Sequence, residues 1–225
     1  MSVPIFVLRP EPGLTATLVA AFEAGLKAKG MALSSVEPVT WSAPAKPFDG
    51  LLIGSANAVR HAGKELDKVS HLPVLAVGAT TAKLAQEAGL QVEHVGSGGL
   101  QDLIDTLPGE PRHLLRLAGE VHVALDVPAH LTLDSCVVYR VQYRRLSADQ
   151  AGLLSGGAIV LLHSGEAGRH FAEECTRLGV DRSRVDIAAM APRILENIGD
   201  GWRSVHVADG PSDAALLDLA GNLCH

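Results

Sequence analysis

The chain contains one strand-to-helix corner twice, and this repeat constrains the fold more than any other feature of the sequence. Residues 51–61 read LLIGSANAVRH and residues 159–170 read IVLLHSGEAGRH, so Ser55 and Ser164 hold equivalent positions. Counting this corner, four landmarks recur in the same order at shifts of about 107 to 113 residues. One such match could arise by chance, but four in register indicate an ancient duplication.

Both halves alternate short apolar runs, bounded by Gly or Pro, with segments of helical period. This alternation predicts an α/β fold with two doubly wound parallel-sheet domains, each covered by helices on both faces. The expected strands are Ile5–Leu8, Leu51–Ile53, Val74–Val77, Leu114–Leu117, Ile159–Leu162, Val185–Ala188 and Val205–Val207.

Three further segments carry structural predictions. Residues 14–30 are expected to form one helix that ends at Gly30 and buries Leu14, Leu18, Ala21 and Phe22. Residues 34–41 and 135–145 are β-prone and polar, and are expected to run as extended strands between the domains. Between residues 116 and 139 we expect no crossover helix. Thr81 and Ser212 are expected to be N-caps.

Composition and charge exclude several classes of function. The formal net charge of −6 argues against a general nucleic-acid binder. The three cysteines are scattered without a CxxC motif, and the ten histidines show no metal-ligand spacing, so we expect no metal site. The N-terminus lacks the features of a signal peptide and no window reaches membrane-span length, which predicts a soluble cytoplasmic protein.

The residues that follow the expected strands are small, hydroxylic or cationic. Because ligands of parallel sheets bind beyond the carboxyl ends of the strands, we expect these residues to bind an anionic ligand in a cleft between the domains. The candidates are Arg9, Ser55, Asn57, Gly78, Thr80, Thr81, Arg116, Ser164, Pro192 and Arg193. The serines and threonines could instead only cap helices, and Tyr139 and Tyr143 could be packing residues.

Three catalytic or cofactor motifs are absent. The GSGG run at 96–99 follows a late strand, so it is a poor dinucleotide fingerprint, and no phosphate-binding P-loop occurs. The Ser164 corner resembles the nucleophile elbow of serine hydrolases but lacks the glycine two residues before the serine. A hydrolase that uses Ser164 therefore remains only a third interpretation, which an acyl-ester assay would test.

Eight segments together resemble the uroporphyrinogen-III synthase family from end to end. They are VLRPEPG, LLIGSANAVR, AVGATTAKLAQEAG, LLRLAGE, VVYRVQY, LHSGEAGRHF, AAMAPRIL and VADGPSDAALLDL. The resemblance implies a cofactor-free lyase that closes the linear tetrapyrrole hydroxymethylbilane into a ring while inverting ring D. Tyr139 matches the tyrosine of the family's VY motif, and the resemblance makes it the candidate that assists hydroxide departure.

The resemblance also implies a discontinuous domain organisation. Domain 1 would comprise residues 1–36 and 142–225, domain 2 residues 38–140, and the linker strands would lie near 34–41 and 136–144. A monomer is expected, with a transient contact to the deaminase that precedes it in the pathway. The sequence departs from the family pattern at Gly54, His163, Arg193 and Ile194, where hydroxyl residues are usual. The alternative to a synthase is a non-catalytic two-domain protein that binds a small polyanion.

Overall fold

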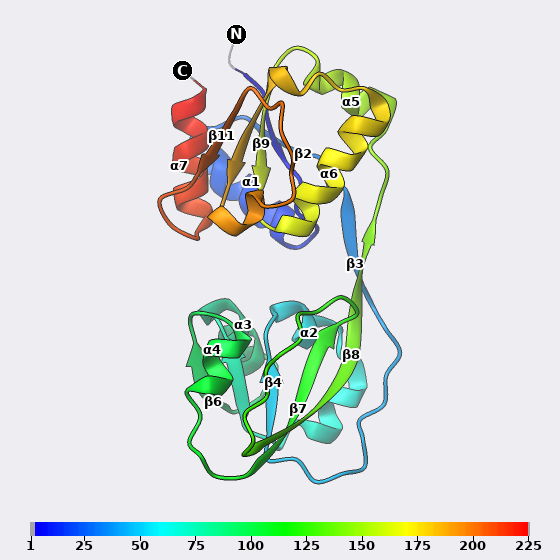
Figure 1. The fold of residues 1–225 in the computed structure, drawn as a ribbon, viewed down its shortest axis with the longest axis vertical. Helices are drawn as coiled ribbons and strands as arrows, with labels where there is room; N and C mark the ends of the chain where they lie inside the picture. Colours follow the sequence, from blue (N-terminus) through cyan, green and yellow to red (C-terminus); the bar gives the residue numbers. More distant parts are fainter. Residues whose placement is uncertain (1–2, 225) are drawn as a thin grey trace. The chain divides into compact units, whose positions relative to one another are not determined.

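The computed structural model describes residues 3–224, and the chain divides into two compact units. Unit 1 comprises Met1–Ser35 and Gln142–His225, and unit 2 comprises Val36–Val141. The chain passes from unit 1 to unit 2 in strand β3 (Ser34–Pro38) and returns in the long strand β8 (Leu131–Tyr143), as Figure 1 shows. Unit 2 is therefore an insertion into unit 1.

Unit 1 is built on a five-stranded parallel sheet with the order β11-β10-β9-β1-β2. The pairing of β1 with β9 joins the two sequence segments of unit 1 into one sheet, because Ile5 of β1 lies opposite Ile159 of β9. The strands are β1 (Ile5–Val7), β2 (Ala28–Gly30), β9 (Ala158–Leu162), β10 (Val185–Ala189) and β11 (Ser204–Val207).

Helices cover both faces of this sheet (Figure 1). One face packs on α1 and α7 through Leu14, Ala21 and Leu216, and the other packs on α5 and α6 through Leu154 and Phe171. The helices are α1 (Gly13–Glu23), α5 (Ala148–Leu154), α6 (Gly165–Leu178) and α7 (Asp213–Leu223), with short 3-10 turns η2 (Arg182–Arg184) and η3 (Pro192–Leu195). Successive residues of a strand therefore face different apolar layers: Ile5 and Val7 of β1 face one layer, and Phe6 faces the other.

Unit 2 contains a six-stranded sheet with the order β3-β8-β7-β4-β5-β6. The pairs β8–β7, β7–β4, β4–β5 and β5–β6 are parallel. The remaining strands are β4 (Gly50–Ile53), β5 (Val74–Val77), β6 (Val92–Gly96) and β7 (Arg112–Gly119). Leu51 and Leu52 of β4 face opposite sides of the sheet, each into its own apolar cluster.

The helices of unit 2 also lie on both faces. One face is covered by α2 (Ala56–His61), η1 (Gly63–Val69) and α3 (Ala79–Glu87), and the other by α4 (Leu100–Asp105). The connection from β7 to the parallel β8 contains no helix, as the sequence predicts. None of the helices within residues 3–224 is long and apolar enough to cross a membrane.

Most element predictions are confirmed, including the α/β class and every expected strand. The prediction for residues 14–30 is wrong in two respects. Helix α1 ends at Glu23, where Gly25 adopts a φ of 75°, and residues 28–30 form the edge strand β2. Phe22, expected on the buried face, is 82% exposed. The apolar period continues across a glycine that ends the helix, so the period alone overstates its length.

The N-cap predictions have a mixed outcome. Ser212 caps α7, because its side-chain oxygen accepts a hydrogen bond from the backbone N–H of Ala215. Thr81 is not a cap: α3 begins after Gly78, and Thr81 is a buried residue of its first turn. Gly78 has a φ of 80°, so the chain turns sharply there and starts the helix earlier than the hydroxyl residues suggest.

Candidate functional site

The first sequence corner forms the strand-to-helix turn between β4 and α2. Ser55 is the N-cap of α2, and its Oγ accepts a hydrogen bond from the backbone N–H of Asn57 at 3.2 Å. The Asn57 side-chain oxygen in turn accepts from Arg60 at 3.0 Å. Both predicted site residues therefore already have a local structural role at the carboxyl end of the sheet.

Arg116 is a buried arginine without a carboxylate partner among the described residues. It lies within β7, not after it, and is only 5% exposed. Its Nη1 donates to the backbone oxygen of Val123 at 2.9 Å, while its buried Nε has no hydrogen-bond partner. Burial lowers the pKa of the guanidinium. A buried cation is energetically costly without a counter-charge, so an anion that binds here would form a favourable charge-assisted hydrogen bond.

A pocket of about 170 Å³ opens beside Arg116. Three of the predicted site residues line it, namely Ser55, Arg116 and Tyr139. They come from the β4–α2 corner, β7 and β8 respectively. These three residues are far apart in the sequence, and unit 2 brings them together around one cavity.

Other residues of this pocket were not predicted as site residues. They include Gly54, Gly119 and His122, whose Nδ1 lies 2.7 Å from the backbone oxygen of Gly119. The only available signal was position, because Gly119 ends a buried apolar run. His122 lies in a loop without periodic pattern, and nothing in the sequence associates it with the pocket.

His61, at the end of α2, flanks Tyr139. Their ring centroids lie 6.3 Å apart at a tilted angle. Burial, followed by the nearby charge of Arg60, lowers the pKa of His61, which favours its neutral form. The tyrosine therefore has a neutral imidazole on one side and the Arg116 charge near its pocket face.

Gly78, Thr80 and Thr81 lie at the start of α3, and none of them lines the Arg116 pocket. Thr80 is exposed, whereas Thr81 is 5% exposed and packs in the helix. These three predicted residues belong to unit 2 but form a separate corner.

Arg9 in FVLRPEPG (residues 6–13) matches Arg116 in LLRLAGE (residues 114–120) in the sequence repeat, but Arg9 has an internal counter-charge. Its Nη1 donates to both carboxylate oxygens of Asp213 at 3.0 and 3.1 Å and also contacts Thr17. His163 lies 2.9 Å from the same carboxylate. The hydrogen bond from His163, followed by the charge of Arg9, lowers the pKa of Asp213 against the opposing effect of burial. The guanidinium of Arg9 is thus largely neutralised within unit 1.

The second sequence corner and the AAMAPRIL motif lie in unit 1. Ser164 caps α6, since its Oγ accepts from the backbone N–H of Ala167 at 3.3 Å. Pro192 and Arg193 begin the 3-10 turn η3 and are exposed. Arg193 makes no ion pair with any residue that the structure describes, so its charge remains available at the surface.

The departures from the family pattern have structural explanations. A Cβ atom at Gly54 would lie 2.7 Å from the Leu100 side chain, so a larger residue there would displace α4 packing. His163 is engaged with Asp213, and Ile194 is buried in the core beneath α6. Three positions that carry hydroxyls in many members thus have packing or ion-pair roles here.

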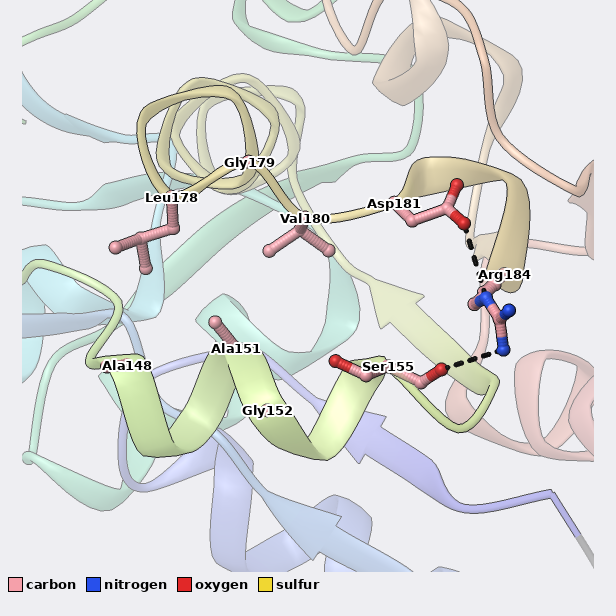
Figure 2. Close-up of a pocket in the computed structure, with 9 residues that line it drawn as sticks. All are labelled: Ala148, Ala151, Gly152, Ser155, Leu178, Gly179, Val180, Asp181 and Arg184. Atoms are coloured by element: carbon pink, nitrogen blue, oxygen red, sulfur yellow. Dashed lines mark hydrogen bonds and ion pairs between the residues drawn. The ribbon is translucent and has the colours of Figure 1, made fainter.

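A second pocket, of about 570 Å³, lies in unit 1 between α5 and the segment that follows α6 (Figure 2). The one cation among its lining residues, Arg184, bonds to Asp181 and to the backbone oxygen of Ser155 at 3.2 Å each. None of the predicted site residues lines it. We therefore do not associate the larger cavity with the predicted chemistry. Residues 3–224 also contain no His, Cys, Asp or Glu cluster suited to a metal ion.

Two parallel-dominated sheets on one discontinuous chain define the class: a two-unit α/β protein with small, hydroxylic and cationic residues near the carboxyl ends of its strands. A family model described as uroporphyrinogen-III synthase HemD matches residues 23–218. The chain belongs to the uroporphyrinogen-III synthase family, whose members are cyclising lyases of haem biosynthesis.

Solved structures agree on the fold. The chain is similar to uroporphyrinogen-III synthetase from Helicobacter pylori 26695, with 18% identity, a TM-score of 0.68 and coverage of 99% of this chain and 100% of that one. It is also similar to a mutant uroporphyrinogen III synthase from the extremely thermophilic bacterium Thermus thermophilus, with 16% identity, a TM-score of 0.59 and 99% coverage of both chains. A comparison with curated protein sequences finds no significant match.

Proposed function

We propose that this chain converts hydroxymethylbilane into uroporphyrinogen III, and that the Arg116 pocket of unit 2 contacts the substrate. Loss of the terminal hydroxyl, which leaves with a proton as water, gives an azafulvene. The substituted α-carbon of ring D attacks it to form a spiro intermediate, which fragments and recloses with ring D inverted. The reclosed ring releases one proton, so the net change is the loss of one water molecule.

The observation that carries this proposal is the uncompensated charge of Arg116. A tetrapyrrole with an acetate and a propionate on each ring presents many carboxylates, and a buried guanidinium with a free Nε favours such a group. The adjoining Ser55 and Tyr139 supply neutral hydrogen-bonding groups. The reaction requires a fixed conformation of a flexible substrate more than it requires a nucleophile, which agrees with such a site.

Tyr139 is our candidate for assisting the departure of hydroxide. A phenolic O–H can donate a hydrogen bond to the leaving oxygen directly or through a water molecule. The proton released on ring closure balances the proton consumed. The remaining contacts in the proposal come from Asn57, Gly78, Thr80 and Thr81 of unit 2 and from Arg9, Ser164, Pro192 and Arg193 of unit 1, with Arg9 the weakest because Asp213 already neutralises it.

The decisive test is an isomer assay. The protein is supplied with freshly generated hydroxymethylbilane, the products are oxidised, and uroporphyrins I and III are separated by chromatography. We expect predominantly type III, because the free bilane closes without inversion to type I. Only type I from folded protein would contradict the proposal, and reversible binding of the bilane in that case would favour the non-catalytic alternative.

We also propose that the protein works as a monomer in the cytoplasm and meets the preceding deaminase only transiently. The cytoplasmic location is supported by the three cysteines, which are all unpaired, as expected for a reducing compartment. Light scattering of the purified protein, alone and mixed with the deaminase, would test this. A stable dimer or a stable complex would contradict it.

A further inference from the structure

Gly119, the last residue of β7, lies directly under the ring of Tyr139. A Cβ atom at this position would lie 2.7 Å from Cζ, 2.8 Å from Cε2 and 3.0 Å from the hydroxyl oxygen of Tyr139. Real side chains do not approach this closely, so either the ring or the strand would have to move. The three nearest atoms all belong to the reactive end of the tyrosine.

The backbone of Gly119 does not itself require glycine. It is not among the described glycines with positive φ, although it is the last residue of strand β7 and lies at a shift in the strand register. Alanine could therefore adopt the same backbone conformation. The absence of a side chain is needed for the ring alone.

A β-bulge brings the two residues together. Ala118 pairs with Val137, but Gly119 pairs with Tyr139, so Val138 is an extra residue on β8. Cys136, Val138 and Tyr139 then all pack against the same apolar cluster, which regular alternation of side chains would not allow. The bulge thus turns Tyr139 toward the side of the sheet where a Gly119 side chain would lie.

Two hydrogen bonds hold the pair in this arrangement. The backbone N–H of Glu120 donates to the backbone oxygen of Tyr139 at 2.9 Å. The Nδ1 atom of His122 lies 2.7 Å from the backbone oxygen of Gly119, which ties the following loop to the same point. The strand end beneath the ring is therefore fixed from both sides.

We propose that Gly119 is a positioning residue for Tyr139, and that its missing side chain creates the seat that holds the phenol hydroxyl at the Arg116 pocket. The inference rests on the proposed function, because it assigns Gly119 a role through a residue that we propose to assist hydroxide departure. The requirement for a residue without a side chain at position 119 follows neither from the charge of Arg116 nor from the family resemblance.

The kinetic test compares Gly119→Ala, Tyr139→Phe and the double variant. We expect Gly119→Ala to lower kcat by about the same factor as Tyr139→Phe, roughly 100-fold for loss of a positioned proton donor, with little change in KM. The double variant should be no slower than Tyr139→Phe alone, because both changes remove one interaction. Multiplicative losses would contradict a role through the tyrosine.

The matched control is Gly109→Ala. Gly109 belongs to the same unit, has no atom within 4 Å of an added Cβ and does not adopt a left-handed conformation. It should keep the wild-type kcat and KM. If Gly119→Ala proves unstable, Tyr139→Leu should restore its stability, since the ring supplies the three closest contacts. Failure of that rescue would mean that something else requires the glycine.

A spectroscopic test is independent of turnover. The chain contains only two tyrosines, Tyr139 and Tyr143, so incorporation of 3-fluorotyrosine gives two ¹⁹F signals that Tyr139→Phe assigns. We expect Gly119→Ala to shift the Tyr139 signal and leave that of Tyr143 unchanged, and Gly109→Ala to shift neither. An unshifted Tyr139 signal would overturn the proposed seat even in a protein that makes type III product. A shifted signal in a protein that makes only type I would uphold the seat while the proposed function fails.

Discussion

Arg9 and Arg116 hold equivalent places in the two halves of the sequence, but their surroundings differ. Arg9 is partly exposed and bonded to Asp213, whereas Arg116 is buried and bonded only to a backbone oxygen. Substitution of each arginine by methionine keeps the apolar stem and removes the charge. We therefore expect Arg116→Met to affect mainly substrate binding and Arg9→Met to affect mainly stability.

For Arg116→Met we expect weaker substrate binding in a protein that stays folded. The variant removes a desolvated charge that no internal carboxylate compensates, so the free energy of unfolding should be unchanged or higher. KM for the bilane should rise by about tenfold or more, as expected for loss of a charge-assisted hydrogen bond. A normal KM would show that the guanidinium does not contact substrate.

For Arg9→Met we expect a loss of stability with a smaller effect on substrate binding. The variant leaves Asp213 with His163 and Thr17 as its remaining partners, and should lower the free energy of unfolding by about 1 kcal/mol, since the pair is partly exposed. KM should change less than in Arg116→Met. Urea unfolding of the two variants in parallel measures this contrast, and equal stability losses would contradict it.

Tyr139→Phe removes one hydroxyl and keeps the ring that packs against the apolar cluster. We expect a reduced kcat with residual formation of type III product, because orientation of the substrate still contributes to catalysis. Initial rates and the ratio of type III to type I product would measure both effects. A complete loss of turnover in a folded variant would show that the tyrosine contributes more than assistance to the leaving group.

At the scale of elements, the two serine corners combine helix capping with a predicted binding role. Ser164→Asp separates these roles, because aspartate caps a helix as well as serine does but adds a negative charge at the same point. We expect wild-type stability and a higher KM for the carboxylate-rich substrate. Ser164→Ala is the control: it should lose about 1 kcal/mol of stability and bind substrate more tightly than the aspartate variant. Equal KM values for the two variants would mean that the corner only caps.

The elements that sequence patterns predict well are those whose pattern is local. The buried strands are mostly apolar, and Ser55, Ser164 and Ser212 cap the helices that follow them. The end of α1 is not predicted correctly because apolar residues continue past Gly25, at Leu26, although the glycine ends the helix. Contacts between residues distant in the sequence have no local pattern and could not be predicted. Examples are the bulge at Val138, which depends on the pairing of β7 with β8, and the hydrogen bond from Arg9 to Asp213.

At the scale of the whole molecule, the two units should respond differently to acid. Both carboxylates that are buried within the described residues, Glu174 and Asp186, lie in unit 1, where hydrogen bonds from Arg177 and Arg203 respectively are the main cause of their lowered pKa values. A carboxyl whose pKa is lower in the folded than in the unfolded state stabilises the fold above its unfolded pKa. That stability is lost as the pH falls from the ordinary carboxyl pKa, about 4, through the lower pKa of the folded state.

Each unit carries one tryptophan that reports on this difference. Trp202 of unit 1 stacks on Phe171, and Trp41 of unit 2 donates to the backbone oxygen of Ala62. We expect the urea midpoint from Trp202 fluorescence, measured in Trp41→Phe, to fall more between pH 7 and about pH 3 than the midpoint from Trp41 in Trp202→Phe. Asp186→Asn should reduce the decrease in the urea midpoint of unit 1 between pH 7 and about pH 3. Equal shifts from both tryptophans would contradict the prediction.

The insertion of unit 2 between the two parts of unit 1 has a consequence for synthesis on the ribosome. Strand β1 emerges first, but its partner β9 begins at residue 158, about 150 residues later. At typical rates of translation this is a delay of roughly 8–30 s, during which β1 can pair only with the edge strand β2 and the apolar faces of β1 and α1 have no complete sheet to join. Unit 2 is one continuous stretch and can fold within that interval. The N-terminal segment is thus the part of the nascent chain that most needs protection by a chaperone, and unit 1 is completed only when α7 has been made.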